Sequence, residues 1–383
     1  MIKIKSICLL ILIPLFGFSQ IKDTTKISKK IDSLLLESQA FIETHNLDLA
    51  FKKLSLAKTI CSDSFGTNSF QYGLVCYKFG NYFEEAGDYP NAEKWYQSTL
   101  EIQTQFQEQQ SLEFANTLNS LAGIYADLAQ VDKAKPMYEK ALAIREQKLG
   151  KLHPDYARVL NNLAGISQYT GAYEKAILQF QEAQQIYATS LGTKHVHYAL
   201  TLNNLANVYF DIGNFNQAEL LYSEALSIRE NSFGRNNPKC AESINCLGNL
   251  YSAMGLKEKA LKYYQEALSI NINTVGENNF GTANCMINIA VICTEMEQYE
   301  KAESFFLKSI EILKNTIGIE NPEYATTLDN MANMYMAKHT YDKAEKLYLE
   351  ALKIRETVLG VEHPEYAWSL NNLGSFYLSL IHI

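Results

Sequence analysis

The sequence predicts an all-α fold, a solenoid of stacked helix–turn–helix repeats, and two observations lead to this prediction. Written in rows of 42 residues, the chain places chemically similar residues in the same columns from row to row, with no insertion or deletion. Within a row, apolar residues recur three and four positions apart on both sides of a glycine, as in two amphipathic helices joined by a turn. Because one hairpin cannot bury its apolar face alone, we expect the rows to stack into one continuous core.

Three columns define the repeat. In the row that begins at Leu202, the small Ala218 lets a neighbouring helix approach, and Tyr222 follows four residues later on the same face. Gly234 suits the left-handed end of the second helix. The bulky column is tyrosine or phenylalanine in every complete row after the first. The alanine column contains Ala50, Ala92, Ala134, Ala176, Ala218, Ala260, Ala302 and Ala344.

In chain order, residues 1–19 come first and are expected to be a signal peptide. Two lysines precede an apolar run, Ile7–Phe16, and small residues then lead to a cleavage site before Gln20. The run is too short for a membrane-spanning helix. We therefore expect an exported protein, periplasmic or secreted, that is not inserted into a membrane after the signal peptide is removed.

The rest of the chain divides according to the period of the columns. Residues 20–33 are expected to be a lead-in, residues 34–369 eight 42-residue repeats, and residues 370–383 a ninth repeat that stops before its second helix. A final helix without a following partner would leave an apolar face bare. Because the terminal Ser-Leu-Ile-His-Ile also resembles translated adapter sequence, we expect the chain to be a fragment of a truncated reading frame.

Composition and motifs argue against several functions. The net charge is -8 and there is no basic stripe, which argues against nucleic acid and against an anionic membrane surface. No phosphate-binding loop, nucleophile turn or Cys-x-x-Cys pair occurs. Most histidines fall in turns or connections, too far apart from row to row to share a metal, and the cysteines after residue 19 are expected to be small buried residues. We therefore expect no enzyme activity, catalytic residue, cofactor or metal site.

Asparagine recurs in the first helices, although its side chain competes for backbone hydrogen bonds and disfavours a helix interior. Two causes remain open: a polar ladder that binds the backbone of a partner, or hydrogen bonds between repeats that set their stacking. Two adjacent columns carry asparagine, one containing Asn203 and the next containing Asn204. Ile287 and Val291 would add an apolar patch beside the ladder. The candidate partner-binding residues are Asn119, Asn161, Asn203, Asn207, Asn245, Asn249, Ile287, Val291, Asp329 and Asn333.

The connections between rows carry a more specific pattern. The segments ALAIREQKLGKLHPDYA, from Ala141, and ALKIRETVLGVEHPEYA, from Ala351, share Arg-Glu, Leu-Gly, His-Pro and Tyr-Ala at matching positions. The recurring Arg–Glu pairs, such as Arg355 with Glu356, are expected to be solvated or to form ion pairs between repeats. Together with the alanine and aromatic columns, these segments resemble tetratricopeptide repeats of the kinesin-light-chain-like subgroup.

The resemblance covers residues 34–383 and implies a right-handed superhelix whose first helices line a concave groove for peptides or protein segments. It implies an exported scaffold that mediates protein–protein interaction. The alternative is that the chain is the sensing or regulatory arm of a larger protein, with a caspase-like protease or a signalling domain beyond it. The fold alone does not decide between these two functions.

Overall fold

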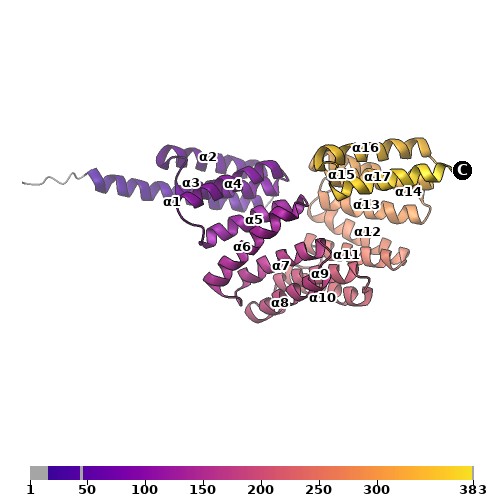
Figure 1. Ribbon diagram of the computed structural model, residues 1–383, viewed down its shortest axis with the longest axis horizontal. Coiled ribbons are helices and arrows are strands. Elements are labelled where there is room, and N and C mark those ends of the chain that lie inside the picture. Colours follow the sequence, from indigo (N-terminus) through magenta and orange to yellow (C-terminus); the bar gives the residue numbers. More distant parts are fainter. Residues whose placement is uncertain (1–15, 44–45, 382–383) are drawn as a thin grey trace, which may run out of the picture. The chain divides into compact units, whose positions relative to one another are not determined.

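The computed structural model describes residues 16–43 and 46–381, and these residues form helices α1 to α17 and no strand (Figure 1). The prediction of an all-α solenoid is confirmed. Most of the predicted signal peptide, residues 1–15, lies outside the described residues. The first helices are α1 (Phe16–Glu43), α3 (Phe70–Glu85), α5 (Leu112–Asp127), α7 (Pro154–Tyr169), α9 (Val196–Asp211), α11 (Pro238–Ala253), α13 (Phe280–Glu295), α15 (Pro322–Ala337) and α17 (Pro364–Ile381). The second helices are α2 (Leu47–Phe65), α4 (Tyr89–Gln105), α6 (Val131–Leu149), α8 (Tyr173–Ser190), α10 (Phe215–Phe233), α12 (Lys257–Thr274), α14 (Tyr299–Thr316) and α16 (Tyr341–Leu359).

The helix boundaries repeat with the 42-residue period of the sequence. From α3 to α17, each first helix starts 42 residues after the previous one, and from α2 to α16 each second helix does the same. Residues 20–33, the expected lead-in, lie inside α1. Ile31 and Leu34 of this helix are buried in a core cluster with Leu54 and Val75. The first hairpin therefore includes residues that precede the first full row.

One column of side chains caps the first helices. In α9, the Nδ1 atom of His195 accepts the backbone N–H of His197 at 3.1 Å. Serine and asparagine usually occupy this place, and here an imidazole nitrogen performs the same task. The histidines that the sequence predicts to lie in the connections between repeats therefore cap the amino-terminal ends of first helices. The column contains Ser69, Ser111, His153, His195, Asn237, Asn279, Asn321 and His363.

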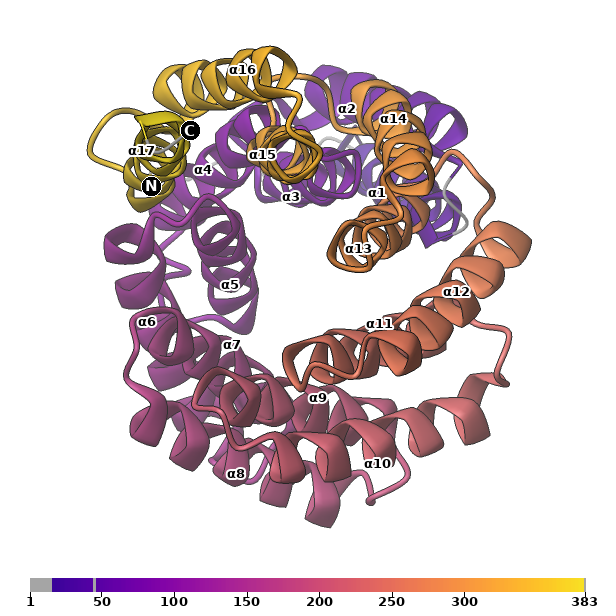
Figure 2. The same cartoon turned by 90° about the vertical axis from the view of Figure 1, so that its right-hand side faces the viewer.

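The chain divides into two compact units, residues 1–151 and 152–383. In the second unit, α7 contacts α9, α11 contacts α13, and α15 contacts both α13 and α17, whereas the extensive contacts of the second helices are with first helices. Within this unit, α9, α13 and α15 lie on the inner side of α10, α14 and α16 (Figure 2). The second helices therefore spread apart on the outer side, and the exposed stripes of the first helices face inward.

The helix α17 packs on α16 and α15. Phe376 is buried, and its ring centroid lies 5.6 Å from that of Tyr348. Trp368, Leu370 and Leu378 of the same helix are exposed, so an apolar face is bare, as the sequence predicts. Among the described helices, none combines the length and the apolar character needed to cross a bilayer.

Candidate partner-binding surface

Polar side chains form a stripe along the inner side of the second unit. In α9, Leu200, Asn204 and Asn207 are half-buried or exposed and recur at helical spacing, which places them on one face. The same positions of the neighbouring first helices complete a surface that is rich in asparagine and carries few charges. This inner polar surface consists of Arg158, Asn162, Leu200, Asn204, Asn207, Glu242, Asn249, Asn284, Asn288, Thr326, Asn330 and Asn333, and the remaining equivalent positions are Gly165, Cys246 and Val291.

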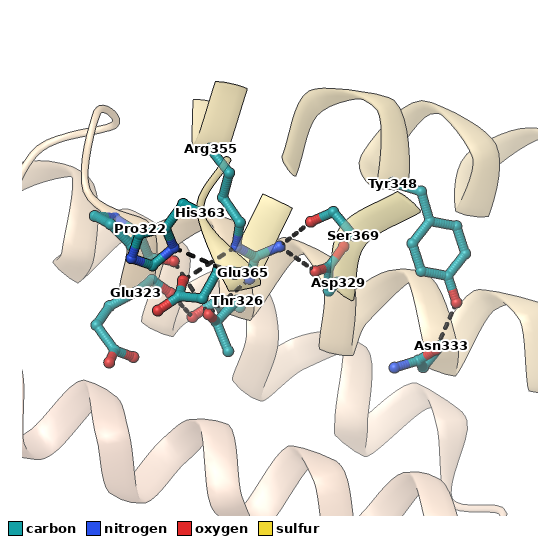
Figure 3. Close-up of polar contacts among 11 residues, drawn as sticks. Pro322, Glu323, Thr326, Asp329, Asn333, Tyr348, Arg355, His363, Glu365 and Ser369 are labelled. Atoms are coloured by element: carbon teal, nitrogen blue, oxygen red, sulfur yellow. Dashed lines mark hydrogen bonds and ion pairs between the residues drawn. The ribbon is translucent and has the colours of Figure 1, made fainter. Parts of the chain in front are cut away.

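One asparagine column on this surface accepts hydrogen bonds from the tyrosines of the bulky column. The hydroxyl of Tyr222 donates to Asn207 Oδ1 at 2.5 Å, and Figure 3 shows the equivalent bond from Tyr348 to Asn333. Burial raises the pKa of Tyr348 to about 12, so its hydroxyl keeps its proton near neutral pH. These bonds join the two helices of one hairpin. The full set is Tyr96–Asn81, Tyr222–Asn207, Tyr264–Asn249 and Tyr348–Asn333, each pair 15 residues apart.

The tyrosine and asparagine columns vary together. Where the bulky residue is phenylalanine and has no hydroxyl, the residue 15 positions earlier has no side-chain acceptor either. Val291, predicted to form part of an apolar patch beside the ladder, is matched in this way to Phe306 of its own hairpin. Only one complete row with tyrosine breaks the rule. Four rows lack the bond, and their residue pairs are Leu54 and Gln39, Tyr138 and Gly123, Phe180 and Gly165, and Phe306 and Val291.

The column of Asn203 lies between the first helices rather than on the inner polar surface. Asn161 and Asn203 are 6% and 8% exposed, and Asp329 is fully buried. Half-buried Asn245 accepts a hydrogen bond at 3.0 Å from the Nδ2 atom of Asn288 on the next first helix. Hydrogen bonding between repeats, one of the two causes that the sequence leaves open, therefore operates at this position.

The adjacent column, one residue later, is the one that faces the inner side. Successive residues point about 100° apart around a helix, so neighbouring columns serve different surfaces. Asn204 and Asn330 are half-buried, and their amides make no hydrogen bond within the described residues. The other two predicted residues, Asn119 and Ile287, are also half-buried, and Ile287 packs against a core cluster that includes Leu328.

Buried arginines join neighbouring hairpins. Arg355 of α16 is fully buried, and its Nη1 atom donates to Asp329 at 2.5 Å and to Ser369 of α17 (Figure 3). Its Nη2 atom donates to Thr326 at 2.9 Å. Burial raises the pKa of the Asp329 carboxyl, and the hydrogen bond from Arg355 opposes this rise. The pair with Asp329 lies within one hairpin, and the expected ion pair between hairpins is the one from Arg355 Nε to Glu365 of α17 at 3.3 Å. Arg355 is not solvated, and the adjacent Glu356 is exposed.

A second buried arginine repeats this arrangement with a neutral partner column. Arg229 of α10 donates at 2.8 Å to Ser243 Oγ and to the carbonyl oxygen of Lys239, both on α11. In this hairpin, Asn203 occupies the column of Asp329. The Oδ1 atom of Asn203 is buried without a hydrogen-bond partner among the described residues. The two hairpins therefore differ by one buried negative charge.

Other reactive side chains are held in unreactive surroundings. Burial raises the pKa of Cys76 and of Cys285 to about 12, so neither thiol is a thiolate near neutral pH. Cys61, Cys240 and Cys293 are buried too, as expected for small core residues, whereas Cys246 is half-buried. The described ranges contain no cluster of three or more histidine, cysteine or carboxylate side chains that could hold a metal.

Stacked helix pairs with polar links inside and between hairpins, and with a polar inner surface, define a helical-repeat scaffold. The profile of the tetratricopeptide repeat family matches residues 113–189, 168–231, 197–271, 239–315 and 323–380. The chain belongs to this family, so the resemblance inferred from the columns is confirmed. No curated protein matches its sequence.

Solved structures share this fold at low sequence identity. The Rap conjugation gene regulator of plasmid pLS20, in complex with the Phr* peptide, is 15% identical over 87% of this chain and 98% of its own, with a TM-score of 0.60. A Rap protein complexed with Competence and Sporulation Factor is 13% identical over 93% of this chain and 99% of its own, with a TM-score of 0.56. A Podosopora anserina protein described as a kinesin light chain with nearly identical TPR-like repeats is 20% identical over 54% of this chain and 97% of its own, with a TM-score of 0.44.

Proposed function

We propose that this protein is a non-catalytic scaffold that binds an extended segment of a peptide or protein along the inner polar surface. The proposal rests on the column of Asn204 and Asn330, whose half-buried amides lie on first helices and make no hydrogen bond within the described residues. An asparagine amide both donates and accepts, so it can bind a peptide group without reading its side chain. The Rap structures with the same fold hold a Phr* peptide and Competence and Sporulation Factor, which supports a peptide ligand here.

The spacing of the first helices suits an extended ligand. Packed helices lie about 8–10 Å apart, and an extended chain advances about 3.3 Å per residue. Each first helix would therefore meet the ligand at every third residue. Because Leu200 is exposed among the asparagines and few charges are present, the surface favours a ligand of mixed polarity and low net charge.

Replacing Asn204 and Asn330 together by alanine is expected to weaken binding by about 0.5–1.5 kcal/mol for each hydrogen bond lost. The melting temperature is expected to stay near that of the unmodified protein, because neither amide bonds to the rest of the described chain. The measurement is isothermal titration calorimetry with a peptide that the full-length protein selects from a displayed random library.

The matched control is Asn207→Ala with Asn333→Ala, one helical turn away on the same surface. This variant removes the acceptors of Tyr222 and Tyr348, so its melting temperature should be lower than that of the unmodified protein. It should bind the peptide more tightly than the Asn204→Ala and Asn330→Ala variant does. An unchanged dissociation constant in the Asn204→Ala and Asn330→Ala variant would exclude these amides from the binding site.

We propose further that the protein is exported and that residues 1–19 are removed. The support is the order of lysines, apolar run and small residues at the start of the chain. Mass spectrometry of the protein recovered from the cells that produce it should find Gln20 at the amino terminus. Soluble cytoplasmic protein that keeps Met1 would contradict export.

The alternative function, a regulatory arm of a larger protein, stays a prediction. Trp368, Leu370 and Leu378 of α17 are exposed, and a following hairpin could bury such side chains. The DNA downstream of codon 383 distinguishes the two functions. Further repeats followed by an effector domain would favour the regulatory arm, and a stop codon would favour the scaffold.

A further inference from the structure

A cavity of about 400 Å³ lies in the first unit between α2 and α4, with α3 on its third side. This aromatic pocket is formed at the junction of the first two hairpins, within the first unit, whereas the inner polar surface belongs to the second unit. Its volume is within the range of pockets that hold small organic ligands. The residues that determine its chemistry are Phe51, Lys58, Phe79, Phe83, Lys94 and Trp95.

The pocket occurs where the first junction departs from four of the later ones. At four later junctions, a tyrosine at the end of a first helix donates to a glutamate 32 residues earlier, at the start of a second helix. At the first junction, the same two positions hold Phe51 and Phe83, so this polar link is replaced by two aromatic rings. The later pairs are Tyr125–Glu93, Tyr251–Glu219, Tyr335–Glu303 and Tyr377–Glu345.

Lys58 is a second departure. Its column is otherwise leucine, isoleucine or glutamine in every complete row, and lysine occurs there only in the first. The Nζ atom of Lys58 lies 5.1 Å from the ring centroid of Trp95 and 5.8 Å from that of Phe79. The rings of Phe79 and Trp95 are themselves stacked, with centroids 4.6 Å apart.

Both charged side chains that line the pocket are positive. Lys58 is half-buried and Lys94 is exposed, and neither ammonium group forms an ion pair within the described residues. A cation over an aromatic face gains about 0.5–1 kcal/mol at exposed sites, less than a charge-assisted hydrogen bond to a carboxylate. Two unpaired ammonium groups beside an aromatic wall therefore suit a ligand that has a ring and an anionic group.

We propose that the aromatic pocket binds a small aromatic carboxylate, with the ring packed against the wall that Phe51, Phe79 and Trp95 form and the carboxylate at Lys58 and Lys94. The same chemical group occurs in a free aromatic acid and at the end of a peptide whose last residue is phenylalanine. Both ligands present a phenyl ring a few bonds from a carboxylate, so the pocket recognises the chemistry that they share.

The test uses the intrinsic fluorescence of Trp95. The protein contains two tryptophans, so Trp368→Phe leaves Trp95 as the single reporter in the full-length chain. Titration with 3-phenylpropionate should change its emission and saturate. Neutral 3-phenylpropanamide should bind about tenfold more weakly or worse, because it cannot form the charge-assisted bonds. Equal affinity for acid and amide, or no saturable change in the folded protein, would overturn the proposal.

Two further variants separate the site from general charge effects. Lys58→Gln should weaken binding of the acid about tenfold, whereas Lys52→Gln, an exposed lysine of the same helix outside the pocket, should not. Phe51→Glu with Phe83→Tyr installs the residue pair of the later junctions and should abolish binding. Equal effects of Lys58→Gln and Lys52→Gln would show that binding depends on net charge and not on the pocket.

A third arm distinguishes the two sources of the ligand. A peptide such as acetyl-Ala-Ala-Phe is compared with the same peptide amidated at its carboxyl terminus. Tighter binding of the peptide acid than of 3-phenylpropionate would assign the pocket to peptide ends, and the reverse order would assign it to free acids. Failure of both carboxylates to bind would overturn the proposal and leave the function proposed for the inner polar surface untouched.

Discussion

Replacing Arg355 by methionine is expected to lower the free energy of unfolding by about 3–5 kcal/mol, the cost of removing one partner of a buried ion pair. The substitution leaves the carboxylate of Asp329 without its positive partner, and Asp329 is 0% exposed. It also removes the hydrogen bonds that Arg355 makes to Ser369 and Thr326. Urea unfolding followed by circular dichroism should show an earlier first transition, because α17 is then less firmly held to α15 and α16.

The repeat supplies the matched control for this prediction. Arg229→Met removes an equivalent buried guanidinium, but the column position of Asp329 is filled there by the neutral Asn203. The loss should be smaller, about 1–3 kcal/mol, the cost of leaving neutral groups without their partner, because the one carboxylate near Arg229, that of Glu242 at 3.6 Å, is exposed to water. Arg355→Met with Asp329→Asn should recover part of the lost stability. If Arg355→Met and Arg229→Met lower the free energy of unfolding equally, the buried carboxylate is not the main cause of the lost stability.

Replacing Phe306 by tyrosine alone is expected to destabilise the protein by about 1–3 kcal/mol, the cost of burying a hydroxyl without a partner. Phe306 is 0% exposed, and the residue that would accept the new hydrogen bond is Val291. In the rows of Tyr222 and Tyr264, an asparagine stands at that position and accepts the bond. Thermal unfolding of the full-length protein measures the effect.

The double variant Val291→Asn with Phe306→Tyr installs the pair found in those rows. It should recover most of the stability that Phe306→Tyr loses, so that a double-mutant cycle gives a favourable coupling between the two positions. If the two substitutions add without coupling, the joint variation of the two columns does not reflect a hydrogen bond.

The order, length and spacing of the helices could be predicted from the sequence, because every row repeats the same local chemistry. Ala218, Tyr222 and Gly234 each belong to columns that run through most of the array, so one ambiguous row does not alter the period. The capping role of His195 also had a signal in the sequence. Its column contains serine, asparagine and histidine, and the one chemical property common to these side chains is a hydrogen-bond acceptor atom.

The candidate site was harder to predict, because its residues differ from core residues only by a rotation about a helix. Asn203 and Asn204 are adjacent and of one type, yet the first is buried between helices and the second is half-exposed. The angle at which neighbouring first helices pack decides which column is buried, and the spacing of residues within a row does not contain that angle. The bond from Tyr222 to Asn207 could have been inferred, since tyrosine and asparagine recur 15 residues apart.

The shared period of caps, turns and links has an evolutionary consequence. From α3 onward, equivalent helices start 42 residues apart, so unequal crossing-over between two equivalent codons adds or removes one whole hairpin and leaves the reading frame intact. Each new boundary then joins a second helix to a first helix with matching columns, as the boundaries within each unit do. The gene can therefore lengthen or shorten its binding surface by one hairpin in a single recombination event. Point mutations such as those at Asp329 and Val291 can then make the repeats differ from one another.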